Sequence, residues 1–177
     1  ERIQQFPNVV RIAAARIVRK PGRLGSKTME MRVVGTTEDW FRLVQRPLSA
    51  GRTFTKWDAH NHEAVCVLTE HGARKLLAND STIGQSIVLG GHYFRVIGII
   101  SNDVGAGAQT PDEDSDVYVP MNVYTGVFGQ ANYEKGQGSH VLERVELQKI
   151  IVQVDSLENV LKTDRAIEAM LTRFHKK

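Results

Sequence analysis

The segment IGQSIVLGGHYFRVIGII, residues 83–100, decides the fold class of this chain because it has the pattern of a β-hairpin. Gln85 to Leu89 is the first predicted strand, and His92 to Ile100 is the returning strand. The Gly90-Gly91 pair between them can adopt the positive φ angles that a two-residue turn requires. The apolar run at the end of the second strand is far too short for a bilayer, which takes about 20 apolar residues. The segment therefore predicts β structure.

Outside this hairpin, short strands alternate with short helices. Strand patterns, rich in β-branched residues or apolar at every second position, occur at Val9–Arg19, Thr28–Gly35, Ala64–Leu68, Val117–Val119 and Ile150–Val154. Capping residues and helical spacing predict helices at Glu38–Gln45, after Thr69, at Val123–Phe128 and after Ser156. Pro21-Gly22 and Gly25-Ser26 predict a loop between the first two strands.

The order of these elements predicts an α+β fold with two lobes. The two ends of the chain, residues 1–46 and 147–177, combine in one α+β lobe, and residues 47–128 form a β-rich inserted lobe. Residues 129–146 are polar and rich in glycine, which predicts a flexible connection. The last helix has one apolar stripe, whose residues we expect to be packed: Val160, Ile167, Met170, Leu171 and Phe174.

Composition is that of an ordinary globular domain, with 41% hydrophobic and 24% charged residues among 177. Charge is distributed unevenly. Residues 1–35 contain eight Lys or Arg and two acids, whereas residues 101–120 contain five acids and no Lys or Arg. A basic strand pair can contact phosphates of nucleic acid or lipid, but alternating charges are also typical of a solvated strand face, and we favour that interpretation. No nucleic-acid-binding motif is present, so nucleic acid is not a predicted partner.

One cluster has the residue types of a metal site: Asp58, His60, His62 and Glu63, with His71 and His92 elsewhere in the chain. We interpret this cluster as a solvated loop and predict no metal. Cys66 stands alone in an apolar strand and is interpreted as a small buried hydrophobe. No phosphate-binding loop and no nucleophile elbow occur, so we predict no cofactor and no catalytic residue.

Five segments, in the observed order, resemble the periplasmic core domain of MacB-type ABC transporter permeases, in the MacB/FtsX-like family. They are VVGTTEDWFRLVQRPLSAGRTFT (33–55), EAVCVLTEHGARKLL (63–77), IGQSIVLGGHYFRVIGII (83–100), DVYVPMNVYTGVFG (116–129) and IIVQVDSLENV (150–160). The resemblance covers nearly the whole chain, and it identifies no catalytic group.

This resemblance implies a porter-like terminal lobe and a domain located in the periplasm, between the first two membrane helices of an inner-membrane permease. It implies that the domain couples ATP-driven motion of those helices to export or release of a substrate. The expected partners are the permease's own transmembrane helices, a nucleotide-binding domain, a second copy of the permease, and a periplasmic adaptor or cargo protein. For the last contact we predict the acidic residues Asp112, Glu113, Asp114 and Asp116.

Two other classes of function remain open from the sequence. One is a metal-dependent or hydrolytic extracytoplasmic enzyme, which the missing catalytic constellation disfavours. The other is a ligand-binding receptor module, which requires a concave apolar pocket.

Overall fold

The computed structural model describes residues 3–77, 83–103, 115–129 and 147–175. Its strands are β1 (Val9–Leu24), β2 (Lys27–Thr36), β3 (Leu48–Gly51), β4 (Val65–Thr69), β5 (Ser86–Leu89), β6 (His92–Ile100), β7 (Val117–Pro120) and β8 (Lys149–Val154). Its helices are the short 3₁₀-helix η1 (Ile3–Gln5), α1 (Asp39–Val44), α2 (Lys56–His60), α3 (Glu70–Leu77), α4 (Met121–Phe128) and α5 (Leu157–His175).

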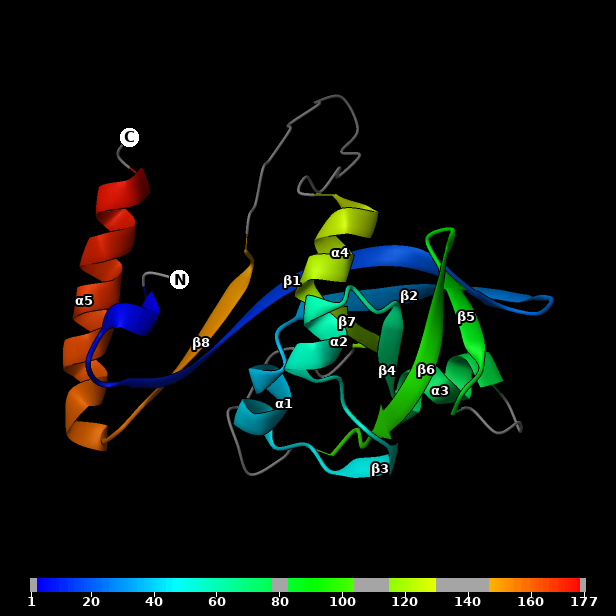
Figure 1. Ribbon diagram of the computed structural model, residues 1–177, viewed down its shortest axis with the longest axis horizontal. Helices are drawn as coiled ribbons and strands as arrows, with labels where there is room; N and C mark the ends of the chain where they lie inside the picture. The colour runs from blue at the N-terminus through cyan, green and yellow to red at the C-terminus, as the bar shows by residue number, and fades with distance from the viewer. Residues whose placement is uncertain (1–2, 78–82, 104–114, 130–146, 176–177) are drawn as a thin grey trace.

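Strands β2, β7, β4, β6, β5 and β1 close into a barrel, because each pairs with the next and β1 pairs again with β2. The pairings of β2 with β7 and of β4 with β6 are parallel, and the others are antiparallel. Closure of this kind removes the open edges at which a sheet could pair with another chain. Figure 1 shows the long ribbon of β1 and β2 crossing behind β4, β6 and β5.

A first apolar cluster joins these strands to α3 and α4, and it consists of Met31, Val33, Cys66, Leu68, Leu76, Ile87, Leu89, Phe94, Val96, Val117, Val119, Val123 and Tyr124. A second cluster forms where α1 and the segment around Phe54 cover the other side of β4 and β7. There the rings of Trp40 and Tyr118 lie 6.3 Å apart, and those of Phe41 and Phe54 meet edge to face at 4.9 Å. These two clusters are the core of the fold.

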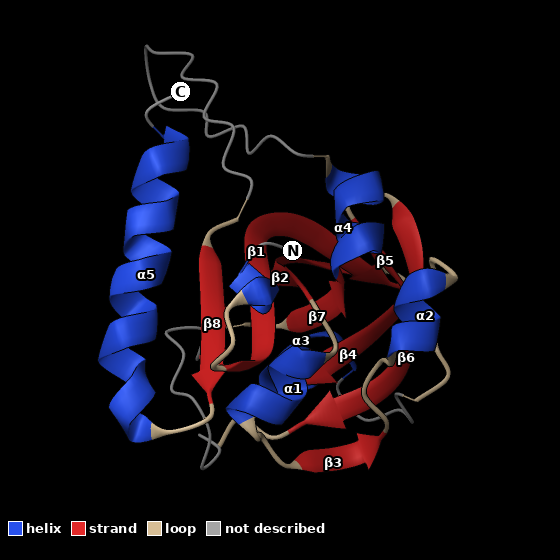
Figure 2. Cartoon of the chain, turned by 60° about the vertical axis from the view of Figure 1, so that its left-hand side comes forward, coloured by secondary structure: helices blue, strands red, loops and turns tan. Residues whose placement is uncertain are grey.

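The terminal elements extend away from the barrel. β8 pairs with the first half of β1, and α5 follows β8 and packs on it, so that both stand at the end opposite the β1–β2 turn (Figures 1 and 2). Among the described residues, no helix is both long enough and apolar enough to cross a membrane.

The mixed α and β architecture and the hairpin at residues 83–100 are confirmed. β5 and β6 pair through Leu89 and His92, and the turn residues Gly90 and Gly91 have φ angles of 55° and 92°. Such a turn with two positive φ angles matches the twist of the flanking strands.

The predicted loop at Pro21-Gly22 is wrong, because both residues lie inside β1 and only Gly25 and Ser26 form the turn. Gly22 is needed in the strand: a Cβ atom there would lie 2.2 Å from the sulfur of Met31, which fills the barrel beside it. Pro21 has no backbone N–H to donate, but its carbonyl oxygen accepts a hydrogen bond from the N–H of Gly90 at 2.9 Å.

The predicted division at residues 46 and 47 does not correspond to a break in the sheet. β1 and β2 come from the segment assigned to the terminal lobe, yet they pair with β5 and β7 from the segment assigned to the insertion. The predicted connection at residues 129–146 lies outside the described residues, apart from Gly129.

Candidate functional site

Strand β1 changes its partner at one position, and that position is the candidate functional site. Residues 9–15 pair with β8, and residues 15–24 pair with β2. Ala15 is in register with both Lys149 of β8 and Thr36 of β2. β1 therefore runs without interruption from the strand that precedes α5 into the wall of the barrel. We call this position, with Ala14 to Arg16 and their partners on β2 and β8, the joint.

Hydrogen bonds tie all three strands together at the joint. The hydroxyl of Thr36, which is fully buried, donates to the carbonyl oxygen of Ala14 at 2.7 Å. The backbone N–H of Gln148 donates to the carbonyl oxygen of Ala15 at 3.1 Å, and the side-chain oxygen of Gln148 accepts the N–H of Ile17. Because backbone N–H and C=O groups need partners, these bonds fix the orientation of β8 relative to the barrel.

Two cations of the joint lie against aromatic rings. Arg16 is only 3% exposed, and its guanidinium carbon lies 5.5 Å from the centroid of the Tyr124 ring. The same side chain donates from Nη1 to the carbonyl oxygen of Gly129 at 3.4 Å. On β8, the Nζ atom of Lys149 lies 5.8 Å from the centroid of the Trp40 ring. Cation–π contacts of this kind gain strength when water is excluded.

The aromatic residue under Arg16 is itself held by close packing. A Cβ atom on Gly35 would lie 2.3 Å from the ring of Tyr124, so only glycine allows this approach of α4 to β2. Burial raises the pKa of the Tyr124 hydroxyl, and the nearby charge of Arg16 offsets part of that rise. The phenol therefore stays protonated at neutral pH, and the ring serves as an uncharged support for the guanidinium.

Beyond the joint, an open groove with a volume of about 510 Å³ lies between β8 and α5. Its lining is mainly apolar, with Thr163 and Asp164 at the helix side, and the aliphatic lining residues are Leu147, Ile150, Val152, Val154, Val160, Ile167 and Leu171. α5 is thus carried by β8 rather than by the barrel (Figure 2).

The predicted packing of the α5 stripe needs correction. Ile167 and Met170 are half-buried, and Val160 and Leu171 keep exposed fractions of 42% and 37%. The stripe faces β8 across the groove, and β8 is an edge strand of six residues, too short to cover a helix of 19 residues. The side chain of Phe174 lies outside the described residues.

Of the predicted acidic contact, residues 112–114 lie outside the described part of the chain, and Asp116 is buried. The Asp116 carboxylate accepts the Nζ of Lys75 at 2.7 Å and the backbone N–H of Arg32 at 2.7 Å. Its exposed fraction is 2%, so it joins α3 to β2 inside the fold. We therefore withdraw Asp116 as a partner contact: the negative charge is already neutralised within the domain.

Asp58 is the buried acid of the histidine-rich segment, and its carboxylate is already hydrogen-bonded within the domain. Its carboxylate receives two hydrogen bonds from the Arg52 guanidinium and two from Thr55, the N-cap of α2. Bonding to Arg52 above all, with help from Thr55, holds the pKa of this carboxyl well below its usual range. In the described residues, no group of three or more His, Cys, Asp or Glu side chains is placed to hold a metal ion.

The residues of the joint were not predicted as a site. One signal was available: Arg16 follows three alanines and precedes Ile17 and Val18, and a cation in such an apolar run is either exposed on an alternating strand or buried with a partner. Sequence alone does not distinguish these cases, because the ring beneath Arg16 belongs to α4, more than a hundred residues away.

Comparison with known proteins gives consistent results. A family model described as "MacB-like periplasmic core domain" matches residues 1–170. The macrolide export ATP-binding/permease protein MacB of Wolinella succinogenes is 26% identical over 175 residues, covering 99% of this chain and 25% of that protein. The pyoverdine export ATP-binding/permease protein PvdT of Pseudomonas putida is 30% identical over 123 residues, covering 68% of this chain and 18% of that protein.

Two solved structures share the fold. The periplasmic region of MacB from Actinobacillus actinomycetemcomitans has a TM-score of 0.77 at 20% identity, covering 99% of this chain and 72% of that one. The extracellular domain of the noncanonic ABC-type transporter YknZ from Gram-positive bacteria has a TM-score of 0.70 at 18% identity, covering 91% and 73%. The chain spans about a quarter of the length of the curated relatives it matches. It therefore belongs to the family of MacB-like periplasmic core domains, which are extracytoplasmic domains of ABC transporter permeases and not enzymes in themselves.

Proposed function

We propose that this domain transmits ATP-driven motion of the membrane helices of an inner-membrane export permease to the periplasmic side, where a substrate is exported or released. The observation that supports this most directly is the continuity of β1 through the joint. A force applied at η1 or α5 would reach the barrel along one hydrogen-bonded strand. Rigid-body coupling of this kind needs packed elements and no catalytic residue.

The path of the force runs through β8 and β1 rather than through α5 itself. α5 packs on β8 across an open groove and has several exposed apolar residues, including Leu157 at 91% and Leu161 at 67%. The joint, by contrast, is bonded on both sides and buried on its β2 side, with Thr36 at 0% and Arg16 at 3% exposure. We therefore assign the rigid connection to the joint rather than to the apolar stripe of the last helix.

The partners follow from this proposal. They are the transmembrane helices and nucleotide-binding domain of the same transporter, a second copy of the permease, and a periplasmic adaptor or cargo protein. The acidic residues Asp112, Glu113 and Asp114 stay our proposed contact for that adaptor or cargo. The names of two relatives state export of macrolides and of pyoverdine, and this supports export of small molecules as the class of activity.

The experiment is a distance measurement in the full-length permease with its nucleotide-binding domain. Lys56 has a side chain that is 81% exposed, so Lys56→Cys offers an accessible label position on α2. The natural Cys66 is fully buried and burial raises the pKa of its thiol, so it should not react with the label. We expect the distance between the labels of the two copies to change when ATP is trapped on the cytoplasmic side. An identical distance with and without trapped nucleotide would contradict the proposal.

A further inference from the structure

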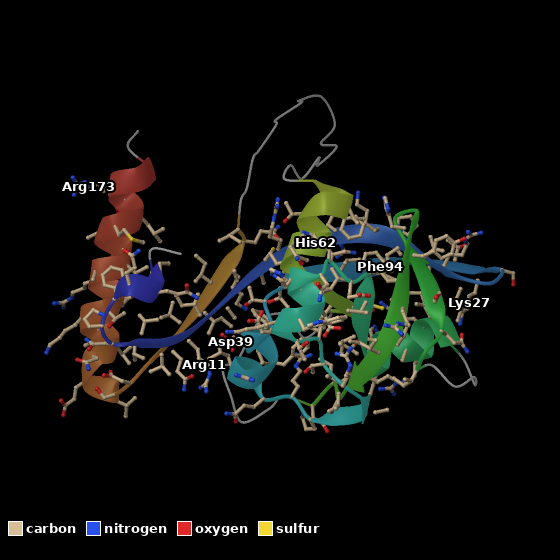
Figure 3. The ribbon with its side chains drawn as sticks, in the orientation of Figure 1. Arg11, Lys27, Asp39, His62, Phe94 and Arg173 are labelled. Atoms are coloured by element: carbon tan, nitrogen blue, oxygen red, sulfur yellow. The ribbon has the colours of Figure 1, made fainter. Side chains whose placement is uncertain are left out.

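A group of exposed cations lies on the barrel wall at the end far from α5. Arg19 and Arg23 are on β1, Lys27 begins β2, and Arg95 is on β6. All four side chains are exposed, and Figure 3 shows Lys27 at the far end of the β1–β2 ribbon. None of the four forms an ion pair or a side-chain hydrogen bond with any residue in the described ranges.

The registers place three of these cations, Arg19, Arg23 and Arg95, on one side of the sheet. Arg23 is directly opposite Val88 of β5, and Val88 is directly opposite Tyr93 of β6, so the three side chains form one row across the strands. Every second residue of a strand points to the same face, which adds Arg19 from β1 and Arg95 from β6. Tyr93, exposed by 68%, stands among them. We call Arg19, Arg23, Arg95 and Tyr93 the basic face. Lys27 is opposite Leu24 of β1 and therefore points to the other side of the sheet.

Several cations elsewhere on the described surface are close to acids of the same domain. Arg42 lies 3.8 Å from Asp39, Lys56 lies 3.8 Å from Glu38, and Arg74 lies 3.9 Å from Glu70. The strands β1, β2, β5 and β6 have one acid, Glu30 of β2. Its register with Pro21 places it on the same side as Arg19 and Arg23, so the cations of this face outnumber the acid three to one. The barrel does not need these positive charges for its own packing, since their side chains are in solvent. Packing of the barrel therefore does not account for their position.

We propose that the basic face binds the headgroups of anionic phospholipids. Arg guanidinium groups fit phosphate oxygens through two parallel hydrogen bonds, and a flat array of several cations suits a surface that presents many phosphates. Tyrosine is enriched where protein meets the interface of a bilayer, because its ring is apolar and its hydroxyl is polar. An acidic protein would supply the opposite charge too, but nothing in this face is concave or apolar enough to select one, with Tyr93 as its single large exposed ring.

This inference rests on the proposed location at the outer side of a membrane, since that location supplies the lipid. The consequence would be a second attachment of the domain to the bilayer, at the opposite end of β1 from the joint. Contact at the basic face would hold the barrel close to the lipid in one state of the transport cycle, and movement transmitted through β1 would have to release it. The attraction is electrostatic and must weaken with salt.

The test uses the 177-residue chain and vesicles, so that its result does not depend on transport. The probe is a vesicle of phosphatidylglycerol and phosphatidylethanolamine in a ratio of about one to three, compared with a vesicle of phosphatidylcholine alone. Co-sedimentation should give binding to the first and not to the second. The double substitution Arg19→Gln with Arg23→Gln should lower the partition coefficient about 25-fold, since each cation near an anionic surface contributes about a fivefold effect.

The matched control is Arg42→Gln with Arg74→Gln, which removes the same charge from exposed positions on α1 and α3. It should bind almost as the unaltered chain does. Equal binding to both kinds of vesicle, no binding to either, or an equal loss in the control variant would overturn the inference. Full competition by soluble glycerophosphate at millimolar concentration would also overturn it, because it would show a site for a free phosphate rather than for a lipid surface. None of these results bears on nucleotide-dependent motion, so the proposed function is judged separately by the label distance.

Discussion

The guanidinium of Arg52 and the carboxylate of Asp58 form a two-point pair, with N···O distances of 2.7 and 2.8 Å, and the carboxylate is 1% exposed. The same carboxylate accepts the backbone N–H and the hydroxyl of Thr55, which completes the capping box of α2. One acid thus holds the segment after β3 and the start of α2 together.

Replacing this acid should destabilise the domain. Asp58→Asn removes the charge from the pair with Arg52 and weakens the cap, so we expect a loss of about 2 kcal/mol in the free energy of unfolding, measured with urea. The control is Asp39→Asn, whose partner Arg42 is 68% exposed and 3.8 Å away. Exposed pairs contribute little, and the control should change stability by less than about 0.5 kcal/mol. Equal losses in the two variants would contradict the role given to Asp58.

The contribution of Asp58 should depend on pH in one direction. Its pKa is lowered in the folded state, so its stabilising effect is complete above the unfolded value of about 3.9 and disappears as the pH falls toward the folded value. The difference in unfolding free energy between the unaltered chain and Asp58→Asn should therefore be constant from about pH 5 to 8 and shrink below about pH 4. A difference that grows as the pH falls would show that the sign is wrong.

Two glycines near α4 should respond oppositely to alanine. A Cβ atom on Gly35 would enter the ring of Tyr124, so Gly35→Ala should cost about 1–3 kcal/mol of unfolding free energy. Gly126, inside α4, has nothing within 4 Å of the added atom, and Gly126→Ala should stabilise the helix by up to about 1 kcal/mol. Urea denaturation of both variants checks the pair. Similar effects of the same sign would mean that α4 does not approach β2 as described.

Much of the local structure could be predicted, because its causes are local. The turn at Gly90-Gly91 needs only two residues that accept positive φ angles, and the pattern around it shows both strands. Closure of the barrel could not be predicted, because it depends on β1 pairing with β2 and β5 at once. The Pro21-Gly22 pair even led to a wrong prediction of a loop. Glycine is required at position 22 because the sulfur of Met31, on the neighbouring strand, leaves no room for a Cβ atom.

The same distinction applies to the candidate site. The acidic residues near position 116 predicted a partner contact, yet Asp116 is buried and is paired with Lys75, 41 positions away in the sequence. The apolar spacing of α5 predicted its orientation but not its depth of burial, because burial depends on how much surface β8 offers. Pairing between distant segments decides both cases.

Truncating a side chain in the barrel should destabilise the domain more than truncating one on α5. Ile87→Ala removes a fully buried side chain from the barrel and should cost about 2–5 kcal/mol of unfolding free energy. Ile167→Ala removes a half-buried side chain from the open groove, so we expect a loss of less than about 1.5 kcal/mol. Equal losses in urea denaturation would show that α5 is packed as tightly as the barrel, and the force would then not need to pass through β8.

The central claim is that β1 transmits motion through the joint, and the most direct test is a flexible insertion there. Two glycines inserted between Ala14 and Ala15 interrupt the strand where it changes partner, whereas two glycines inserted between Gly25 and Ser26 lengthen only the β1–β2 turn. Both variants are made in the full-length permease with the label at Lys56→Cys, after circular dichroism has shown that each domain is folded. We predict that the insertion at the joint abolishes the nucleotide-dependent change in label distance and that the insertion in the turn preserves it. A normal distance change with the joint interrupted would contradict the account.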